Sequence, residues 1–215
     1  MPPQLNKVEL VGFCGSDFTH ALSNLASNSK GLNEEKKLRI SKRLKMLVEH
    51  EHYFIFKKSS LHFLASLDIN SYIDLIKYRI GDIVTVDDGT NNKYYIPVDW
   101  CAKEKEFYIE HLESSLQKYH STLERLIRDE SMSQKRANES TRLYLPRGNQ
   151  ITADVTLDFH EFVRFLRLWY SVRAQLEIKN IAKQMLDLVA DTGAFPETLE
   201  AFGLTINGDP RGPFL

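Results

Sequence analysis

Apolar and polar residues alternate in three short stretches of the chain, and each stretch predicts a β-strand. These stretches cover residues 7–14, 60–69 and 153–157. The segment 81–97 combines a short apolar run with turn-forming residues, so it predicts a loop or a hairpin.

Apolar residues that recur every three or four positions predict several amphipathic helices. The longest regular pattern runs from about Lys103 to Asp129. Another long helix is expected to begin at Asp158, where Glu161 completes a capping-box pattern, and to continue past Ile178. Shorter helices are expected after the potential caps Ser16 and Asp17, after Asn33, and from about Asn70 to Ile80. A few strands among long helices indicate an α+β fold.

The length of 215 residues suits one domain, so we expect a single domain over 1–215 with a loosely held, turn-rich tail at 203–215. The net charge of -1 gives no bulk electrostatic reason to expect nucleic acid or an anionic membrane as a partner. No apolar run approaches the length that crosses a bilayer, and no secretory signal pattern begins the chain. Cys14 and Cys101 provide neither a metal spacing nor a disulfide framework. We therefore expect a soluble, cytoplasmic protein.

Short motifs of common catalytic sites are absent: there is no glycine-rich phosphate loop, no GxSxG, no HExxH and no CxxC. His50 and His52, in "EHEH", are the obvious candidates for a metal site. Because they are two residues apart, they share a face on a strand but not on a helix. No third convincing ligand lies nearby in the sequence, so we expect no metal.

Several segments, taken in order, resemble the flavin-dependent thymidylate synthases, the ThyX family. The resemblance is best at "TLDFHEFVRFLRLW" (156–169), which is similar to the family's Thr-x-Asn-x-Arg-x-Leu-x-x-Phe-Leu-x-Leu-Arg, and at "AQLEIK" (174–179), which is similar to its Ala-Gln-x-Glu-Ile. Further matches are "TRLYLP" (141–146) to Ala-Arg-x-x-Leu-Pro, "KYR" (77–79) to Arg-His-Arg, "VEHEH" (48–52) to a His-rich turn, and "VELVGFCGSDFTHAL" (8–22) to the opening strand and helix. Order and spacing agree over about residues 7–202, which we expect to be the core.

This resemblance implies a ThyX-like fold of long helices with a small, mostly antiparallel sheet. It implies a homotetramer in which several subunits build each active site. The implied activity makes dTMP from dUMP, with FAD as the cofactor and with methylenetetrahydrofolate and NADPH as co-substrates. Because the flavin carries the hydride and no protein cysteine attacks the pyrimidine, the part left to the protein is positioning and electrostatics.

The matched positions imply two groups of site residues. The residues expected to hold the flavin are His50, His52, Lys77, Arg79, Asp158 and His160. The residues expected to bind the nucleotide are Arg79, Arg142 and Gln175. Arg142 suits a phosphate or a uracil carbonyl, but a surface arginine at a helix end explains it equally well. Asp158 replaces an asparagine and can cap a helix. His160 replaces an arginine, and its alternatives are a flavin or phosphate contact and a half-exposed place in the first helical turn.

Two departures from the family pattern bear on activity. The family's Ser-rich loop corresponds here to "GDIVTVDDGT" (81–90), whose carboxylates would repel a phosphate unless a cation intervenes; an ordinary solvated turn is the simpler interpretation. Trp169 stands where the family has the arginine that activates the pyrimidine, and a neutral indole cannot stabilise negative charge on that ring. We expect Trp169 in the core or at a subunit interface, with stacking on a flavin or base as the alternative.

Arg173 lies four residues after Trp169, which places both on one face of a continuous helix. One hypothesis makes Arg173 the catalytic cation that replaces the lost arginine, and a solvated arginine or one paired with Glu177 is the simpler alternative. Three functions remain open at this point. They are a thymidylate synthase of this type, a relative that acts on another pyrimidine nucleotide, and a catalytically silent scaffold or binding homologue.

Overall fold

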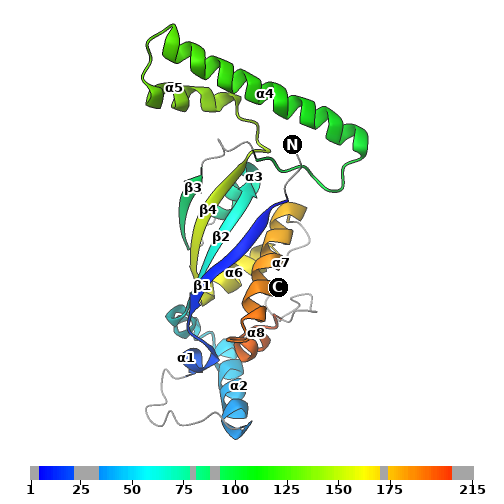
Figure 1. The fold of residues 1–215 in the computed structure, drawn as a ribbon. Helices are drawn as coiled ribbons and strands as arrows, with labels where there is room; N and C mark the ends of the chain where they lie inside the picture. Colours follow the sequence, from blue (N-terminus) through cyan, green and yellow to red (C-terminus); the bar gives the residue numbers. More distant parts are fainter. Residues whose placement is uncertain (1–4, 22–33, 78–80, 88–92, 170–173, 205–215) are drawn as a thin grey trace. The chain divides into compact units, whose positions relative to one another are not determined.

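The described strands form one four-stranded sheet (Figure 1). The computed structural model describes residues 5–21, 34–77, 81–87, 93–169 and 174–204. Its strands are β1 (Lys7–Cys14), β2 (Ser60–Asp68), β3 (Asp82–Asp87) and β4 (Gln150–Asp158), in the order β1-β2-β4-β3. The three predicted strands are confirmed. The loop or hairpin predicted at 81–97 is wrong in part, because β3 pairs with β4, a partner distant in the sequence.

Helices account for most of the other described residues. They are α1 (Asp17–Ala21), α2 (Glu34–Glu49), α3 (Ile69–Lys77), α4 (Ala102–Arg128), α5 (Gln134–Thr141), α6 (Phe159–Trp169), α7 (Leu176–Asp191) and α8 (Pro196–Ala201), with the 3-10 turns η2 (Tyr53–Lys58) and η3 (Arg142–Tyr144). The α+β class is confirmed, and α4 agrees with its predicted bounds. The long helix predicted from Asp158 is wrong as one element: α6 ends at Trp169, and the backbone at Gln175 is extended before α7 begins.

The backbone groups into two compact units, and each is described by itself. The first contains the described parts of Met1–Asn6, Ser66–Ile73 and Thr85–Ala153. The second contains the described parts of Lys7–Ala65, Asp74–Val84 and Asp154–Leu215. The single domain expected over 1–215 stays a prediction.

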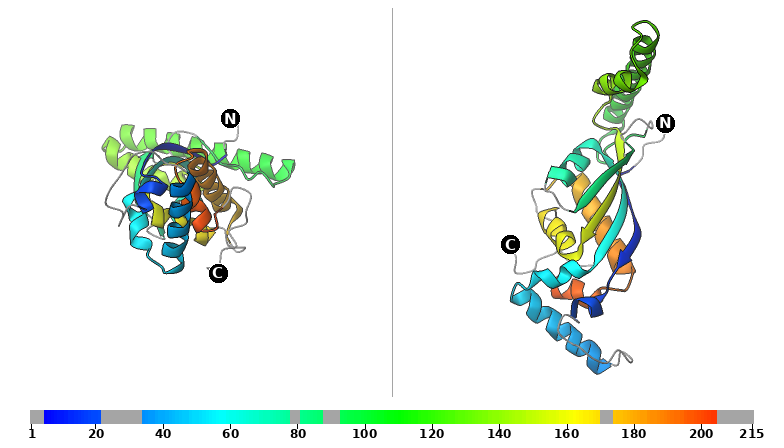
Figure 2. Two further views of the ribbon diagram at one scale, coloured as in Figure 1. Left: turned by 90° about the horizontal axis from the view of Figure 1, so that it is seen from below. Right: turned by 90° about the vertical axis from the view of Figure 1, so that its left-hand side faces the viewer.

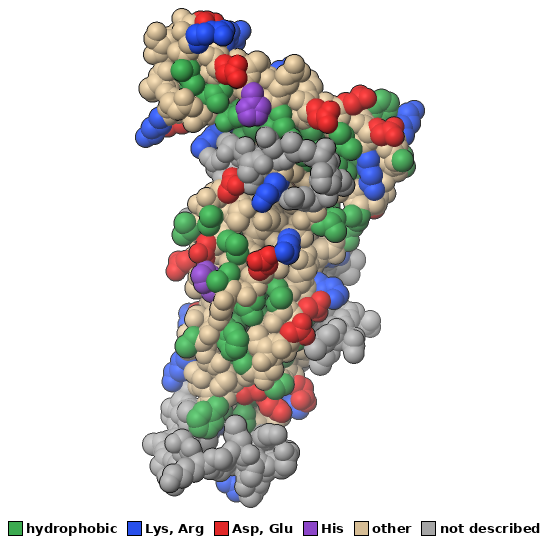
Figure 3. Space-filling model, in the orientation of Figure 1, with side chains coloured by type: hydrophobic (Ala, Val, Ile, Leu, Met, Phe, Trp, Pro, Cys, Tyr) green, Lys and Arg blue, Asp and Glu red, His purple; other side chains and the backbone are tan. Residues whose placement is uncertain are grey.

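In the second unit, helices cover one side of the strands. Helix α7 packs against β1, and α6 packs against α7. Figure 2 shows both helices on the same side of the sheet. Strand β2 alternates accordingly: Leu61, Phe63 and Ala65 are buried, whereas His62 and Leu64 are half-buried. Figure 3 shows acidic and basic side chains interspersed with apolar ones on the face turned to the viewer, in keeping with the net charge of -1.

Phe159, the first residue of α6, lies at the centre of an aromatic cluster in this unit. Its ring centroid is 4.9 Å from that of Phe195, 5.6 Å from that of Phe162 and 5.1 Å from that of His20. These four side chains are fully buried. Burial of large aromatic rings supplies much of the apolar free energy of folding, so this cluster fixes the start of α6 against α1 and α8.

A chain of buried polar side chains crosses the same cluster. The Thr198 hydroxyl donates to the Asp17 carboxylate at 2.6 Å, and His20 Nδ1 lies 3.0 Å from the Thr198 oxygen. His20 Nε2 lies 2.6 Å from Ser59 Oγ. Because Thr198 has already given its only proton to Asp17, it accepts from His20 Nδ1–H, and His20 Nε2 accepts from the Ser59 hydroxyl. These hydrogen bonds therefore assign His20 a single neutral tautomer, with its proton on Nδ1.

Ser16 and Asp17 were named together as potential caps of α1, and Ser16 fills this role, whereas Asp17 caps a different helix. The carboxylate of Asp17 accepts hydrogen bonds from the backbone N–H groups of Glu197 at 2.9 Å and Thr198 at 2.7 Å. These donors lie in the first turn of α8, where the backbone N–H groups have no partner within the helix. The local contact at α1 is instead made by Ser16, whose hydroxyl accepts from Thr19 N at 3.4 Å.

In the first unit, Asp68 joins the end of β2 to the start of α3. Its Oδ1 accepts from the backbone N–H groups of Asn70 at 2.9 Å and Ser71 at 3.1 Å, which is the geometry of a helix cap. Its Oδ2 accepts from Asn6 Nδ2 at 2.7 Å and from the Ser71 hydroxyl at 2.6 Å. The buried carboxylate is thus satisfied by donors on every side, which is what burial of a charge requires.

Candidate functional site

The 3-10 turn η2 and helix α6 pack against each other in the second unit, and they bring two rings together. Tyr53 begins η2, and His160 is the second residue of α6. Their ring centroids are 5.2 Å apart and the ring planes differ by 11°, so the rings are stacked. Both side chains are half-buried, so each ring keeps part of its surface towards solvent. The stack is thus a partly exposed pair of rings, and the buried ring of Phe202 also lies against Tyr53, with centroids 6.2 Å apart.

Three cationic side chains lie near this pair of stacked rings. The guanidinium carbon of Arg167 is 5.9 Å from the centre of the Tyr53 ring and 5.6 Å from that of Phe202, which is cation–π distance. Arg164 lies one helical turn after His160 on α6, and Lys57 lies on η2. In the part of the chain that the structure describes, no carboxylate forms an ion pair with Lys57 or Arg164. We call Tyr53, Lys57, His160, Arg164 and Arg167 the Tyr53–His160 cluster.

His160 is held neutral by its surroundings. Burial lowers the pKa of His160 below its usual value, because burial disfavours the charged imidazolium. The positive charges of Arg164, Lys57 and Arg167 lower this pKa further, and the carboxylate of Asp158 opposes them. The cluster therefore combines permanent cations with an imidazole whose pKa lies below its usual value.

Asp158 and Glu161 form the capping box that their spacing predicts. Glu161 N donates to the Asp158 carboxylate at 2.7 Å, and Asp158 N donates to the Glu161 carboxylate at 3.1 Å. Two of the N–H groups that lack a partner at the start of α6 are thus satisfied reciprocally. Both acidic side chains next to His160 are engaged in this cap. The predicted flavin contact of Asp158 stays a prediction.

Replacing Asp158 with alanine should lower the free energy of unfolding by about 1 kcal/mol, because the substitution removes a helix cap. Asp158→Asn should lower the free energy of unfolding by only a few tenths of that amount, because asparagine caps a helix about as well as aspartate does. Urea unfolding of both variants beside the wild type measures the difference. Equal losses in the two variants would show that the charge of Asp158, rather than its cap, supports the fold.

His50 and His52 lie in the turn between α2 and η2, and both are exposed. Their rings are parallel, with centroids 6.3 Å apart, and His50 Nδ1 is 2.9 Å from the backbone oxygen of Met46. Tyr53 of the cluster follows directly in sequence. Within the described residues, no group of three or more histidine, cysteine or acidic side chains has the geometry of a metal site. The flavin contacts predicted for His50 and His52 are not tested by these positions.

The other predicted residues are distributed as follows. Lys77 is exposed at the end of α3, and Gln175 is exposed at the N-cap of α7. Arg79 and Arg173 lie outside the described residues. Arg173 therefore keeps its catalytic role only as a hypothesis. The segment predicted as an Asp-rich loop is β3, with Asp82 and Asp87 at its ends, and Asp88 lies outside the described residues.

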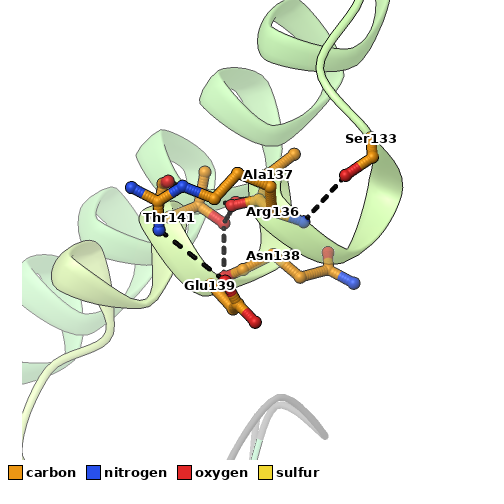
Figure 4. A network of polar contacts seen from close by, with 7 residues as sticks. Ser133, Arg136, Ala137, Asn138, Glu139 and Thr141 are labelled. Carbon is orange, nitrogen blue, oxygen red and sulfur yellow. Dashed lines mark hydrogen bonds and ion pairs between the residues drawn. The ribbon is translucent and has the colours of Figure 1, made fainter.

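Helix α5, which Figure 4 shows from close by, belongs to the first unit, and Arg142 follows at its end. The Ser133 hydroxyl accepts from Arg136 N at the start of this helix, and the Thr141 hydroxyl donates to the backbone oxygens of Ala137 and Asn138 at its end. Arg142 then begins the 3-10 turn η3 with an exposed side chain. The position at a helix end agrees with the plain structural interpretation, and it also leaves the guanidinium accessible to a ligand.

Trp169 is the last residue of α6, and only 8% of it is exposed. Its ring lies 6.5 Å from that of Phe165, which is also buried. The expectation that Trp169 lies in the protein interior is confirmed. A ring with so little accessible surface cannot offer a full face to a flavin or a base in this arrangement, so the stacking alternative receives no support here.

A comparison with known protein families identifies the chain. The family described as "Thymidylate synthase complementing protein" matches residues 13–196, which include η2, α6 and the Tyr53–His160 cluster. The chain belongs to this family. Membership in the thymidylate synthase complementing family confirms the ThyX resemblance seen in the sequence motifs.

Individual relatives agree with this assignment. A flavin-dependent thymidylate synthase from Clostridium tetani (strain Massachusetts / E88) is 29% identical over 178 residues, which are 75% of this chain and 69% of the relative. The crystal structure of a UMP/dUMP methylase, PolB from Streptomyces cacaoi bound with 5-Br UMP, has a TM-score of 0.71 and 20% identity, over 92% of this chain and 93% of that one. The second likeness supports the fold. No helix among the described residues is long and apolar enough to cross a membrane.

Four members of the cluster were missed by the sequence reasoning: Tyr53, Lys57, Arg164 and Arg167. Arg164 could have been found, because it follows His160 at the spacing that shares a helix face. Tyr53 and Lys57 could not, since nothing local in the sequence predicts that η2 packs against α6. The family pattern has an unspecified residue at Arg167, so it draws no attention to this position either.

Proposed function

We propose that this chain is a flavin-dependent enzyme that methylates a uracil nucleotide at C5. The observation that carries the proposal is the Tyr53–His160 cluster within a member of the thymidylate synthase complementing family. An aromatic surface beside several cations is what a nucleotide needs, because its rings stack and its phosphates pair with Lys and Arg. The name of the Clostridium tetani relative supports a flavin as the group that binds.

The residues present fit FAD. The Tyr53–His160 stack is a partly exposed pair of rings, while Lys57, Arg164 and Arg167 can neutralise a pyrophosphate. Asp158 and Glu161 are engaged in the helix cap, and the negative charge of Asp158 acts on His160 against the three cations. When bound, flavin supplies hydride transfer, and the protein supplies position and charge. His50, His52 and Lys77 belong to the proposed flavin contacts, as the family resemblance implies.

The proposed reaction is complete in its atoms and electrons. Methylenetetrahydrofolate would provide the carbon, and NADPH, by way of a bound flavin, would supply the hydride that reduces the transferred methylene to a methyl group. The proton lost from C5 of the uracil ring and one proton from solvent would go to the two nitrogens that the methylene leaves. The products are the 5-methyl nucleotide, tetrahydrofolate and NADP. Arg142 and Gln175 are the proposed nucleotide contacts, with Arg79 and Arg173 as further candidates. We further propose a homotetramer in the cytoplasm, as the family resemblance implies.

The nucleotide has two candidates. dUMP is the substrate named by the family resemblance, and the name of the PolB relative gives UMP as well. The two differ by one ribose hydroxyl. A site built to hydrogen-bond that hydroxyl would reject the substrate that lacks it, so the ratio of kcat/KM for the two nucleotides decides between them.

An assay of the purified protein tests the proposal. We expect a yellow protein, or one that becomes yellow with FAD, and we expect its visible spectrum to shift on addition of dUMP or UMP. Incubation with methylenetetrahydrofolate and NADPH should then yield a nucleotide heavier by one methylene group. A colourless protein that FAD cannot reconstitute would contradict the flavin enzyme and favour the silent scaffold. Flavin binding without a response to either nucleotide would indicate a different substrate.

Neighbouring lysines on η2 provide a matched pair of variants. Lys57 contributes to the positive field at His160, whereas Lys58 makes no such contribution. Lys57→Ala should weaken FAD binding about tenfold, the usual effect of losing one charge-assisted contact. Lys58→Ala should bind FAD as the wild type does. Equal affinities in the two variants would remove Lys57 from the proposed flavin site.

A further inference from the structure

We propose that binding of a phosphate-bearing ligand at the Tyr53–His160 cluster is coupled to uptake of a proton by His160. This inference rests on the proposed function, because the ligand would be the flavin nucleotide or the substrate nucleotide. It adds that the affinity depends on pH and that one histidine is responsible. The ligand class is an anion of charge two or more, such as a phosphate or pyrophosphate group.

The geometry places His160 where it can respond to an anion. Its ring is stacked on Tyr53 at 5.2 Å, so one face is covered and the ring is held in place. Arg164 follows on the same helix face, and Lys57 and Arg167 approach from η2 and from further along α6. The charge of each of these three cations acts on His160, so an anion bound among them acts on the imidazole as well.

The charges around His160 explain why the free protein keeps it neutral. Lys57, Arg164 and Arg167 repel a proton, and partial burial adds to this effect. The negative charge of Asp158 raises the pKa of His160 and so opposes the cations. Glu161, which lies near Asp158, is engaged in the helix cap. Tyr53 faces the ring without a charge. All these groups lie on η2, on α6 or at the junction of β4 and α6.

A bound anion reverses the balance. It neutralises the field of the three cations and adds a partner for an imidazolium N–H, so the pKa of His160 rises. By linkage, a ligand that raises this pKa must bind more tightly when His160 is protonated. A rise of one unit corresponds to about a tenfold difference in affinity between low and high pH. The affinity should therefore increase as the pH falls from the pKa of His160 in the complex to its pKa in the free protein.

The test is an NMR pH titration of histidine-labelled full-length protein, with the His160 signal assigned from its absence in His160→Gln. Sulfate is the probe, since it stays doubly charged across the useful pH range, and sodium chloride at equal ionic strength is the control. We expect sulfate to raise the pKa of His160 by about one unit, following the linkage above. His62, whose Nε2 lies 2.6 Å from the Asp154 carboxylate on β2 and β4, is the internal control, and its NMR signal should not respond to sulfate.

Two variants of His160 distinguish anion binding that is coupled to proton uptake from binding by electrostatic attraction alone. In His160→Arg the charge is permanent, so sulfate affinity should be high and independent of pH. In His160→Gln the charge is absent, so affinity should be lower at acid pH and again independent of pH. If wild-type affinity were as flat with pH as that of both variants, the coupling would be refuted. Circular dichroism of each variant confirms that it is folded.

The same titration with FAD distinguishes this inference from the proposed function. A rise in the pKa of His160 with both sulfate and FAD supports the coupling and the flavin site together. A rise with sulfate alone supports the coupling but contradicts FAD as the ligand of this cluster. A rise with FAD alone supports the coupling for the nucleotide. An unchanged pKa with both probes overturns the inference, whatever the activity assay gives.

Discussion

The folded protein should lose about 3 kcal/mol of unfolding free energy as the pH falls from about 7 to about 4, and His20 should cause most of this loss. His20 is fully buried, and burial lowers its pKa from 6.5 to about 4. The unfolded chain has an ordinary histidine pKa. Protonation of His20 is therefore much harder in the folded state than in the unfolded state.

The sign follows from proton counting. Between about 4 and 6.5 the unfolded state binds a proton on His20 and the folded state does not. Stability then rises with pH throughout this window and is lost as the pH falls through it. Asp17 acts in the other direction at the acid end, since burial raises its pKa and the folded state holds its proton more readily. The change between pH 6.5 and 5, about 1.5 kcal/mol for His20, is consequently the cleaner quantity to measure.

Burial explains why a charged His20 is disfavoured, although hydrogen-bond partners lie beside both of its ring nitrogens. His20 Nδ1 already donates to Thr198, whose hydroxyl serves Asp17. A second proton on Nε2 would face Ser59 Oγ at 2.6 Å, and this hydroxyl must then turn its own proton to the Phe56 backbone oxygen at 3.3 Å. The surrounding rings of Phe56, Phe159 and Phe195 supply no solvation for a charge.

Urea unfolding at a series of pH values gives the measurement. His20→Gln should be less stable than the wild type at neutral pH, because the packing and one hydrogen bond are lost. It should also lose the steep dependence between pH 6.5 and 5, since no titrating group remains at this position. An equally steep dependence in His20→Gln would show that other groups cause the acid sensitivity.

Local sequence patterns correctly predicted the elements whose hydrophobic pattern lies entirely within their own consecutive residues. The alternation in β1 and β2 and the helical period of α4 are properties of consecutive residues, and the structure confirms them. Strand β3 was not recognised, because its strand character comes from pairing with β4. Helices α6 and α7 were predicted as one helix, since apolar residues continue at helical spacing across the interruption at Ala174 and Gln175.

The same distinction holds for the candidate site. The cap between Asp158 and Glu161 could be predicted because the two residues are three apart. The cap that Asp17 provides for α8 could not, because its acceptor and donors lie at opposite ends of the chain. The stack of Tyr53 on His160 also joins residues that lie far apart in the sequence, so no local pattern predicts it. Family motifs led to His160 without revealing which residues surround it.

Replacing Trp169 with arginine should lower the free energy of unfolding by about 3 kcal/mol or more. This substitution restores the residue that the family pattern has at this position. Trp169 is 8% exposed and packs beside Phe165, so the new guanidinium would lose its hydration without gaining a known counter-charge. A gain in catalytic activity is not expected, because the side chain is buried rather than open to a ligand.

Leu168 gives a matched control for this experiment. It is the neighbouring residue on α6 and is 40% exposed, so Leu168→Arg introduces the same side chain at a position with access to water. We expect a loss of at most about 0.5 kcal/mol there, as for an ordinary surface substitution. Trp169→Phe should cost about 1–2 kcal/mol, since it keeps an apolar ring and leaves a small void.

Urea unfolding of the three variants, followed by nucleotide binding and the methylation assay, decides what Trp169 does. If Trp169→Arg is as stable as Leu168→Arg and binds dUMP or UMP more tightly, the side chain faces a ligand, and its burial in the isolated chain does not describe the working enzyme. If Trp169→Arg is unstable and Trp169→Phe keeps its activity, the tryptophan is a packing residue. The cation that the family has at this position must then come from another residue, and Arg173 remains the hypothesis for that role.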